Sequence, residues 1–282
     1  YDAVRLILDR HFALSMQALE QGPLDLLMWP ETVYPTTFGT PKSEDGAAYD
    51  REIAAFVARS GTPLLFGAYD VDEGREFNAA VLLEPGPPGK MQFDTYRKAK
   101  LFPFTERVPS WIDTSALRAS MPWAGTWKDG VGSPILSMRR RDGRELILAP
   151  LICYDAVDPM LAIAAARQGA EAIVTMSNDS WFAEGGGPRL HLVVSAFRSL
   201  ETRRPQLRVT TTGVSAVITP TGEIISSLGV HEQGVLVANV QPAHDSSTLM
   251  LAWGDWFGPV AFLIGIGALL LSFRRCADAT RA

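Results

Sequence analysis

Apolar segments with helical spacing alternate along most of this 282-residue chain with short apolar runs that are typical of buried strands. Residues 4–20 place apolar side chains three and four positions apart, and Gly22-Pro23 separates them from the run LDLLMW at 24–29. Such alternation is typical of an α/β domain, in which helices cover the faces of a sheet. Hydrophobic residues make up 47% of the chain, which is enough for the core of one large domain and excludes disorder as the main state.

The same pattern predicts the remaining elements. We expect helices at 4–20, 49–60, 159–168 and 190–202. We expect strands at 24–29, 63–69, 77–84, 145–153, 172–176, 207–209, 214–218, 224–226 and 235–239. A Pro- and Gly-rich turn at 85–89 and the sequence TPTG at 219–222 interrupt the apolar runs. Because helices and strands are interleaved, the sequence predicts one α/β domain.

The net charge and the positions of the cysteines and histidines exclude two classes of function. Twenty-six basic residues face thirty-one acidic ones, and the net charge of -5 provides no cationic field for a phosphate backbone. Cys153 and Cys276 lie far apart, and the four histidines occur singly, so no zinc spacing such as HExxH or CxxC is present. We therefore expect no nucleic-acid partner, no metal and no other cofactor.

The C-terminal part of the chain contains an uncharged run, WFGPVAFLIGIGALLLSF, at 256–273. Its length is close to the roughly 20 residues that a bilayer-spanning helix needs. Trp253 and Trp256 lie at one margin, where interfacial aromatic residues are common, and three arginines follow the other: Arg274, Arg275 and Arg281. We expect one transmembrane helix with a cytoplasmic tail at 274–282. The alternative is a buried core helix.

The N-terminal end of the chain shows no signal peptide. Tyr1 is followed by an amphipathic pattern, without a basic segment and without the apolar segment that a signal peptide has. We therefore expect that an upstream part is missing.

Three predicted strand ends carry side chains that are out of keeping with their surroundings. Glu31 follows the run at 24–29, Lys98 lies in YRKAKLFPFTERVP at 96–109, and Cys153 ends LILAPLIC at 146–153. Taken singly, these are ordinary features: a capping or ion-paired carboxylate, a solvated cation and a buried inert cysteine. Together they supply a base, a cation that lowers a thiol pKa and holds an oxyanion, and a nucleophile for acyl transfer. No GxSxG elbow is present, which disfavours a Ser/His/Asp site.

These residues lie in segments that resemble a known superfamily. WPET at 29–32, YRKAKLFPFTERVP at 96–109 and LICYD at 151–155 resemble the glutamate, lysine and cysteine motifs of the nitrilase or carbon–nitrogen hydrolase superfamily. The apolipoprotein N-acyltransferase branch is indicated by three further segments: SNDSWF at 177–182, residues 191–224 and TLMLAWGDWF at 248–257. The resemblance covers nearly the whole chain.

The resemblance implies an architecture and a location. It implies a nitrilase-like αββα sandwich as the catalytic domain at 1–247, a linker at 248–255 and the transmembrane helix at 256–273. The catalytic domain would lie on the periplasmic side of a bacterial inner membrane. The first sheet strand and an N-terminal bundle of membrane helices would precede Tyr1.

The resemblance also implies roles for residues. Glu31 would be the general base, Lys98 would stabilise the oxyanion and the thiolate, and Cys153 would form a thioester. The supporting residues would be Glu106 as a second acidic group that orients the site, Tyr154 as a backbone oxyanion donor, Asp155 behind it, and Trp181 lining the pocket near the thiol. Three positions depart from the branch: Asp155 replaces a more usual Glu, Thr105 a Gly, and Thr211 an Asn.

The activity implied by the resemblance is a two-step acyl transfer. Cys153 would take a fatty acyl chain from a phospholipid, and the amine of a lipoprotein's N-terminal diacylglyceryl-cysteine would then attack the thioester. The segment 109–127 would form apolar loops at the bilayer surface, or else a packed loop, together with the aromatic residues Phe102 and Phe104. Two alternatives stay open: an amidase or nitrilase that hydrolyses a small C–N substrate with the same residues, and a non-catalytic, membrane-anchored binding domain.

Overall fold

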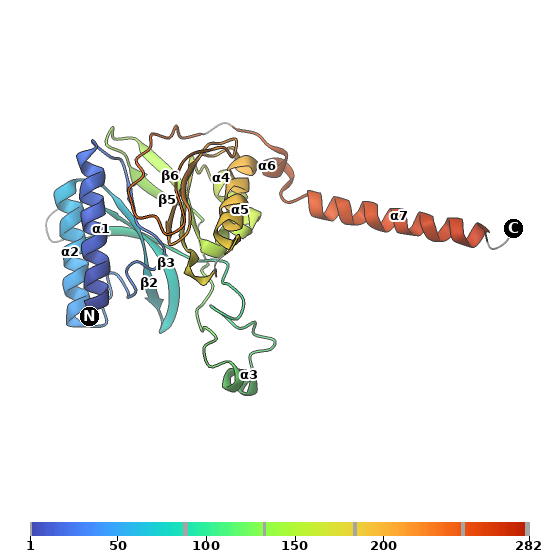
Figure 1. Ribbon diagram of the computed structural model, residues 1–282, viewed down its shortest axis with the longest axis horizontal. Helices are drawn as coiled ribbons and strands as arrows, with labels where there is room; N and C mark the ends of the chain where they lie inside the picture. The colour runs from blue at the N-terminus through green and yellow to red at the C-terminus, as the bar shows by residue number, and fades with distance from the viewer. Residues whose placement is uncertain (1, 87–89, 132–133, 183–184, 244–245, 280–282) are drawn as a thin grey trace.

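The computed structural model describes residues 2–86, 90–131, 134–182, 185–243 and 246–279. Two sheets lie face to face, and helices cover the outer side of each (Figure 1). The helices on the first sheet are α1 (Asp2–Glu20) and α2 (Glu44–Ser60), and those on the second are α4 (Pro159–Arg167) and α5 (Gly187–Thr202). The predicted αββα sandwich is therefore confirmed for this part of the chain.

The first sheet has the order β1-β2-β3-β4 and is mostly antiparallel. Its strands are β1 (Leu27–Met28), β2 (Leu64–Asp72), β3 (Arg75–Glu84) and β4 (Gln92–Arg97). Only the β1–β2 pair is parallel. The polypeptide that leaves β1 and the polypeptide that leaves β4 both turn toward the second sheet, as the hydrogen bonds of the site below show.

The second sheet has the order β10-β9-β8-β7-β6-β5. Its strands are β5 (Leu136–Arg139), β6 (Glu145–Ile152), β7 (Ala172–Asn178), β8 (Gln206–Thr211), β9 (Ser215–Ile218) and β10 (Ile224–Leu228). The three central strands β6, β7 and β8 are parallel, so their carboxyl ends meet at one edge. This is the edge at which an open α/β sheet usually binds its ligand.

Alternation of side chains along the strands builds the layers of the core. In β2, Leu64 and Phe66 pack toward α1 and α2, whereas Leu65 packs against the second sheet. In β6, Leu148 and Ile152 point between the sheets, whereas Leu151 packs toward α4. Both central strands are therefore apolar on both faces, which is why each reads in the sequence as a continuous apolar run.

The structure corrects several sequence expectations about elements. Residues 235–239 form no strand, because this extended segment has no ladder partner among the described strands, and Val235 instead packs against the core of the first sheet. No range was predicted for β5 or for β4, the strand that ends just before Lys98, since β4 is half exposed and polar at alternate positions and β5 has only four residues. The expected strand at 24–29 shrinks to two paired residues.

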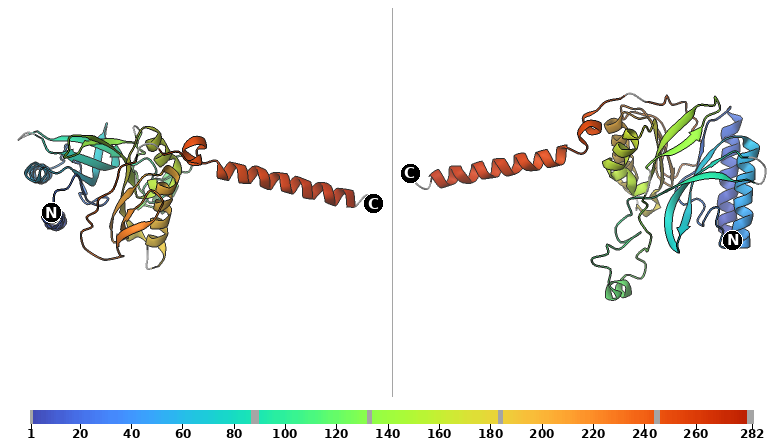
Figure 2. Two further views of the ribbon diagram at one scale, coloured as in Figure 1. Left: turned by 90° about the horizontal axis from the view of Figure 1, so that it is seen from above. Right: turned by 180° about the vertical axis from the view of Figure 1, so that it is seen from behind.

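The C-terminal segment leaves the body of the molecule. A short helix, α6 (Leu249–Trp253), lies where a linker was expected and contacts α4 and α5. The final helix, α7 (Phe257–Ala279), projects away from the sandwich (Figures 1 and 2). Among the residues that the structure describes, no helix has both the length and the apolar character that crossing a bilayer requires.

Candidate active site

Glu31 lies just beyond β1, in a segment that crosses closely over β2. The Gly67 N–H donates to the Pro30 carbonyl, and a Cβ at Gly67 would lie 2.3 Å from the Thr32 nitrogen, so only glycine permits this approach. The Glu31 side chain is 5% exposed. Its Oε1 accepts from Asn78 Nδ2 at 2.8 Å, and its Oε2 accepts from the Asn178 backbone N–H at 2.7 Å. Strand β7 of the second sheet thus holds a carboxylate that the first sheet supplies.

Lys98 follows β4 and is the most deeply buried cation of the site, with 1% of its surface exposed. Its Nζ donates to Glu31 Oε1 at 3.2 Å and to Glu106 Oε1 at 2.8 Å. Burial works against the charge of Lys98, but the two carboxylates and the nearby Cys153 outweigh it and raise the lysine pKa above its ordinary value. The ammonium therefore stays charged at neutral pH.

Glu106 belongs to a tight loop after Lys98. Its backbone N–H donates to the Phe102 carbonyl, and its Oε2 accepts from the Phe102 N–H at 2.7 Å. Its Oε1 also receives a longer hydrogen bond, 3.3 Å, from Asn78 Nδ2. Two carboxylates thus share one ammonium and one amide, and the loop fixes the second carboxylate against the first.

Cys153 lies at the turn between β6 and the short 3₁₀ helix η1 (Cys153–Val157). Its backbone φ is +48°, in the left-handed region, which is uncommon for a residue with a side chain. A nucleophile on such a sharp strand-to-helix turn presents its side chain at the end of the sheet, with the backbone N–H groups of the turn beside it. Tyr154 provides the first of these backbone groups, and its ring packs edge-to-face on Phe102.

Asp155 fixes this turn from behind. Its Oδ1 accepts from the backbone N–H groups of Ala99 and Lys100, and its Oδ2 accepts from the Ile152 N–H and the Tyr96 hydroxyl. The carboxyl has no exposed surface. Burial raises its pKa from the ordinary 3.8 to about 6, while Lys98 and the hydrogen bonds from Ile152, Lys100 and Tyr96 limit that rise. Asp155 therefore ties the lysine-bearing segment to the cysteine turn.

The thiol lies in a field of opposing charges. Burial and the Glu31 carboxylate raise the pKa of Cys153 to about 12, while Lys98 and the Ser177 side chain act to lower it. The resting cysteine is therefore a neutral thiol next to a carboxylate. An arrangement of this kind suits deprotonation of the thiol by Glu31 during attack, in place of a stored thiolate.

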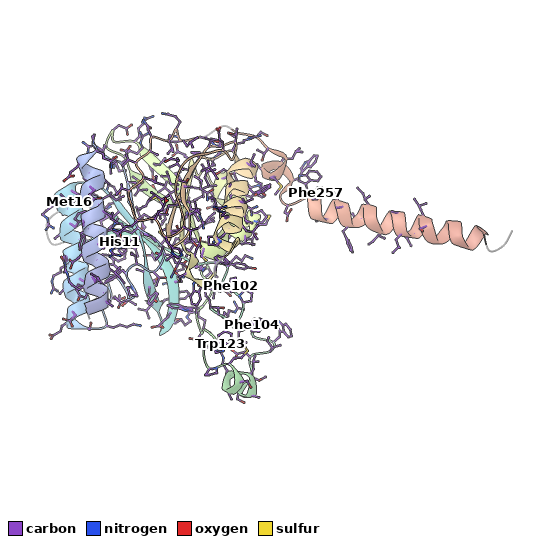
Figure 3. All side chains as sticks on the ribbon, in the orientation of Figure 1. His11, Met16, Phe102, Phe104, Trp123 and Phe257 are labelled. Carbon is purple, nitrogen blue, oxygen red and sulfur yellow. The ribbon has the colours of Figure 1, made fainter. Side chains whose placement is uncertain are left out.

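The other expected site residue, Trp181, lies in the short turn η2 (Asp179–Trp181) and is 69% exposed. A projecting loop segment, here called the aromatic arm (residues 101–127), carries α3 (Ser115–Ser120) away from the sandwich (Figure 1). Phe102, Phe104 and Trp123 are exposed along it (Figure 3). Trp127, at its base, packs on Tyr69.

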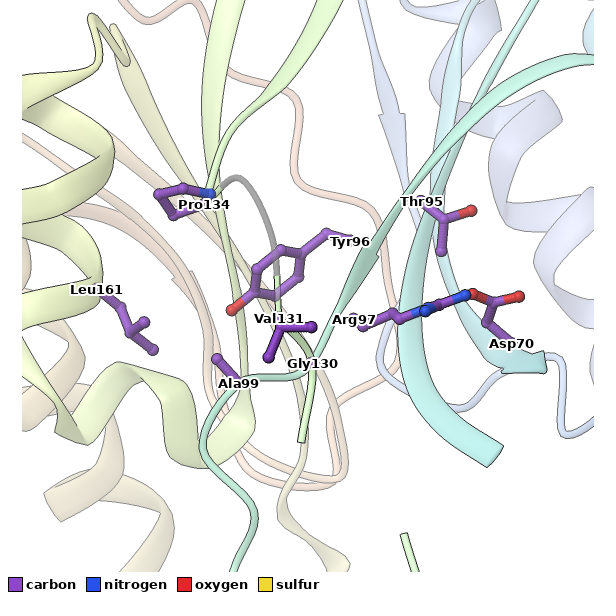
Figure 4. Close-up of a pocket in the computed structure, with 9 residues that line it drawn as sticks. All are labelled: Asp70, Thr95, Tyr96, Arg97, Ala99, Gly130, Val131, Pro134 and Leu161. Carbon is purple, nitrogen blue, oxygen red and sulfur yellow. The ribbon is translucent and has the colours of Figure 1, made fainter. Parts of the chain in front are cut away.

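A small cavity of about 230 Å³ lies beside β4, with Leu161 of α4 among its lining residues (Figure 4). Tyr96 lines this cavity and donates its hydroxyl to Asp155. Arg97, also in the lining, points toward Asp70, with Nε to Oδ2 at 2.6 Å. Cys153 is not among the lining residues, so this cavity is separate from the thiol. In the described part of the chain, no cluster of His, Cys, Asp or Glu has the form of a metal site.

Sequence reasoning gave no role to several residues that the structure brings to the site. Asn78, in the middle of an apolar strand, contacts both carboxylates. Asp179, His191 and Arg208 form a buried cluster behind Cys153. The signal for Asn78 was a lone amide in the run EFNAAVLLE, where burial of an unpaired polar group is costly.

A helix–sheet–sheet–helix sandwich with a carboxylate, an ammonium and a thiol gathered at one sheet edge is a nitrilase-like architecture. The sequence profile of the carbon–nitrogen hydrolases matches residues 6–247, and the chain belongs to the carbon–nitrogen hydrolase family. This assignment confirms the superfamily that the three motifs indicated.

Curated relatives share one name. The chain is 33% identical over 268 residues to a Pseudomonas aeruginosa protein named apolipoprotein N-acyltransferase, covering 93% of this chain and 48% of the relative. It is 30% identical over 291 residues to the Chlorobaculum tepidum protein of the same name, covering 95% of this chain and 53% of the relative. The chain thus spans about half the length of these relatives, which are acyltransferases by name.

Solved structures agree on the fold. A Saccharomyces cerevisiae member of branch 10 of the nitrilase superfamily superimposes with a TM-score of 0.60 at 18% identity, covering 82% of each chain. An amidase from Nesterenkonia sp. AN1 gives a TM-score of 0.57 at 20% identity, covering 80% of this chain and 84% of that one. At these identities the likeness establishes the sandwich and nothing about the substrate.

Proposed function

We propose that this chain transfers a fatty acyl group from a phospholipid, through a thioester on Cys153, to the N-terminal diacylglyceryl-cysteine of a lipoprotein. The observation that carries the proposal is that Asp155 ties the segment after Lys98 to the Cys153 turn, while the Asn178 N–H and Lys98 hold the buried Glu31 carboxylate at the same sheet edge. The shared name of the curated relatives supports lipoprotein N-acylation as the reaction that this site serves.

In the first step, Glu31 takes the thiol proton as the sulfur attacks the ester carbonyl carbon of the phospholipid. The carbonyl oxygen becomes an oxyanion, stabilised by the Lys98 ammonium and the Tyr154 N–H. The C–O bond then breaks, and the glycerol oxygen leaves with the proton that Glu31 held. Cys153 is left as a thioester, and a lysophospholipid departs.

In the second step, the lipoprotein amine attacks the thioester carbonyl and Glu31 takes a proton from the attacking nitrogen. The C–S bond breaks, the thiolate recovers that proton, and an amide remains on the lipoprotein. Glu31 therefore acts as base and acid in each half-reaction, which requires its carboxylate to stay near the sulfur. Its hydrogen bond to the Asn178 N–H favours that position.

Exposed apolar surface favours a lipid donor over a small soluble amide. Trp111 and Trp123 on the aromatic arm are 83% and 62% exposed, which is unusual for tryptophan away from an interface. We propose that the arm contacts the bilayer and admits acyl chains to Cys153, with Trp181 beside their path. Exposed aromatic rings of this kind are typical of amphipathic segments that lie in the membrane interface.

We further propose that the apolar run at 256–273 anchors the domain as one transmembrane helix, with the catalytic domain in the bacterial periplasm. Within α7, Phe262, Leu263 and Ile264 are each more than 65% exposed, and the helix projects from the body with no described element packed along it (Figure 2). An exposed apolar helix is stable in lipid, because its side chains contact apolar lipid chains and its backbone N–H and C=O groups are hydrogen-bonded within the helix.

The proposal is tested by incubating the chain in detergent with phospholipid and without lipoprotein, and by measuring its intact mass. We expect a gain of one fatty-acyl group that hydroxylamine removes. The adduct should be absent from Cys153→Ala and retained in Cys276→Ala, the matched control at the other cysteine. A folded protein that gains no adduct and hydrolyses simple amides would contradict acyl transfer and favour the amidase alternative.

A further inference from the structure

A buried polar cluster lies directly behind the cysteine turn and takes no part in the steps above. It consists of Asp179 at the start of η2, His191 on α5 and Arg208 on β8, and each is at most 6% exposed. The three side chains come from separate elements, so their meeting is a product of the tertiary fold. Burial of two charged groups and an imidazole is costly unless their contacts repay it.

The cluster ends on the backbone of Cys153. His191 Nε2 lies 3.1 Å from the Cys153 carbonyl oxygen, and because a carbonyl only accepts, Nε2 carries the proton and donates it. On the other side of the ring, Nδ1 lies 2.9 Å from Asp179 Oδ1 and 3.2 Å from Arg208 Nη2. The histidine therefore bridges a buried carboxylate and the peptide group of the nucleophile.

Asp179 is itself held from three sides. Arg208 Nη2 donates to its Oδ2 at 3.0 Å, and the Ser177 hydroxyl donates to its Oδ1 at 2.6 Å. Arg208 is anchored in turn by its Nε, which donates to the Val214 carbonyl at 3.2 Å. Burial acts to raise the pKa of Asp179, but His191 and Arg208 outweigh it and hold that pKa below its ordinary value. The carboxylate is charged and has little freedom to move.

A hydrogen bond to the Cys153 carbonyl has a consequence on the other side of the same peptide bond. The peptide unit is planar and trans, so the Cys153 C=O and the Tyr154 N–H point in opposite directions and rotate together. A donor that fixes the carbonyl therefore fixes the direction of the N–H. It also polarises the peptide, which strengthens the N–H as a donor.

The backbone at Cys153 makes such a constraint necessary. A φ of +48° in a residue with a Cβ costs on the order of 1 kcal/mol relative to the common regions, so the turn relaxes unless its surroundings hold it. Asp155 holds the residue before Cys153 by accepting from the Ile152 N–H. The His191 hydrogen bond is the described side-chain contact on the Cys153 carbonyl itself.

We propose that His191, oriented by Asp179 and Arg208, is a positioning residue that aims the Tyr154 N–H at the oxyanion formed on Cys153. It touches neither substrate nor sulfur and acts through the peptide plane. This inference rests on the proposed function, because it presupposes that Cys153 is acylated through a tetrahedral oxyanion.

Two reagents separate this role from a general effect on the thiol. Acylation of Cys153 by p-nitrophenyl butyrate passes through an oxyanion, whereas alkylation by iodoacetamide is a direct displacement that forms none. In His191→Leu we expect acylation to slow by about 10- to 100-fold, less than the roughly 10²- to 10³-fold that deletion of an oxyanion donor costs. Alkylation should change by less than about threefold, because the thiolate requires no oxyanion donor.

The conservative variant is His191→Gln, whose amide reproduces an N–H near the position of Nε2, and it should recover most of the acylation rate. His231→Gln, at an exposed loop histidine, is the matched control and should leave both rates unchanged. If His191→Leu slows the two reagents equally, or slows neither, the positioning role is wrong.

A second variant disturbs the cluster without removing any of its polar groups. A Cβ on Gly213 would lie 2.1 Å from Asp179 Oδ2, so Gly213→Ala displaces the carboxylate that orients His191. We expect it to slow acylation selectively, as His191→Leu does. Gly186→Ala, where a Cβ meets nothing within 4 Å, is its control. Failure of the unmodified chain to be acylated at Cys153 would overturn the proposed function and this inference with it.

Discussion

The two halves of the candidate site are held in place by different means. The half from the first sheet consists of charged side chains that fix one another: the Lys98 ammonium lies between the Glu31 and Glu106 carboxylates, almost entirely away from water. The half from the second sheet consists of a neutral thiol on a left-handed backbone turn, held through peptide groups by Asp155 and His191.

This difference follows from the cost of burial. An ammonium or a carboxylate is tolerated inside a protein only when an opposite charge or several donors compensate it, so these groups must be assembled together. A thiol is small and nearly apolar, and it can be buried alone. Loss of one charge should therefore damage the first half as a whole, whereas a change that acts on the thiol itself should mainly alter reactivity.

The largest effect should come from Lys98→Met, which leaves two buried carboxylates without their shared cation. Removal of one partner of a buried ion pair costs about 3–5 kcal/mol, and we expect that loss in the free energy of unfolding, together with loss of Cys153 acylation. Chemical denaturation followed by tryptophan fluorescence measures it. Lys100→Met is the control, because its half-exposed pair with Asp158 contributes at most about 1 kcal/mol.

Equal free energies of unfolding for Lys98→Met and Lys100→Met would contradict the view that the first half of the site depends on mutual charge compensation. It would mean that Glu31 and Glu106 take up protons or water at little cost once Lys98 is gone. The first half of the site would then be no more dependent on mutual charge than an ordinary surface pair.

The sequence predicted which residues meet at the site better than it predicted which residues hold them in place. Glu31 and Cys153 were recognisable because each ends an apolar run, where a polar group needs a reason to be present. Lys98 lies among other cations after a polar segment and gained meaning only together with these two residues. Asp155 and Glu106 were predicted from the family resemblance and not from the pattern of apolar residues. The α/β class followed from the alternation of helical and strand-like segments, whereas the αββα layers were implied only by the family resemblance.

What the sequence could not give was the contact between distant segments. Asn178 reaches Glu31 across 147 positions and His191 reaches Cys153 across 38, and no periodicity encodes such pairings. The left-handed backbone at Cys153 was equally hidden, because cysteine has no preference for that region as glycine has. Residues 235–239 failed as a strand since β pairing depends on a partner that the local pattern does not contain.

A smaller effect should appear in the pH dependence of stability at Asp155. Burial raises the pKa of Asp155 to about 6 from 3.8, so the folded state holds this proton more tightly than the unfolded chain. Its contribution to stability is therefore fully present below pH 4 and is lost as the pH rises through about 6. Asp155→Asn has no titrating group there, so the difference in unfolding free energy between wild type and variant should shrink from pH 4 to pH 7 by on the order of 2 kcal/mol.

Denaturation curves at pH 4, 5, 6 and 7 measure this difference, and Asp158→Asn is the partly exposed control on the same turn. A difference that grows with pH would show that the four donors around Asp155 outweigh burial and lower its pKa. The second half of the site would then be held by charge as strongly as the first.

The smallest expected effect concerns the pKa of the Cys153 thiol in the second half of the site, which the Glu31 carboxylate of the first half influences. Burial, followed by the Glu31 carboxylate, holds the pKa of Cys153 high, so Glu31→Gln should lower that pKa by about one unit, and Glu106→Gln, a weaker influence, by less. Because the thiol is almost fully protonated at pH 8, the thiolate fraction in Glu31→Gln should rise about tenfold, and iodoacetamide alkylation should speed up about threefold, since a less basic thiolate is a weaker nucleophile. Acylation by a phospholipid should fall in the same variant, since the base is lost. Parallel changes in the two rates would mean that Glu31 acts on the cysteine only through its charge and transfers no proton.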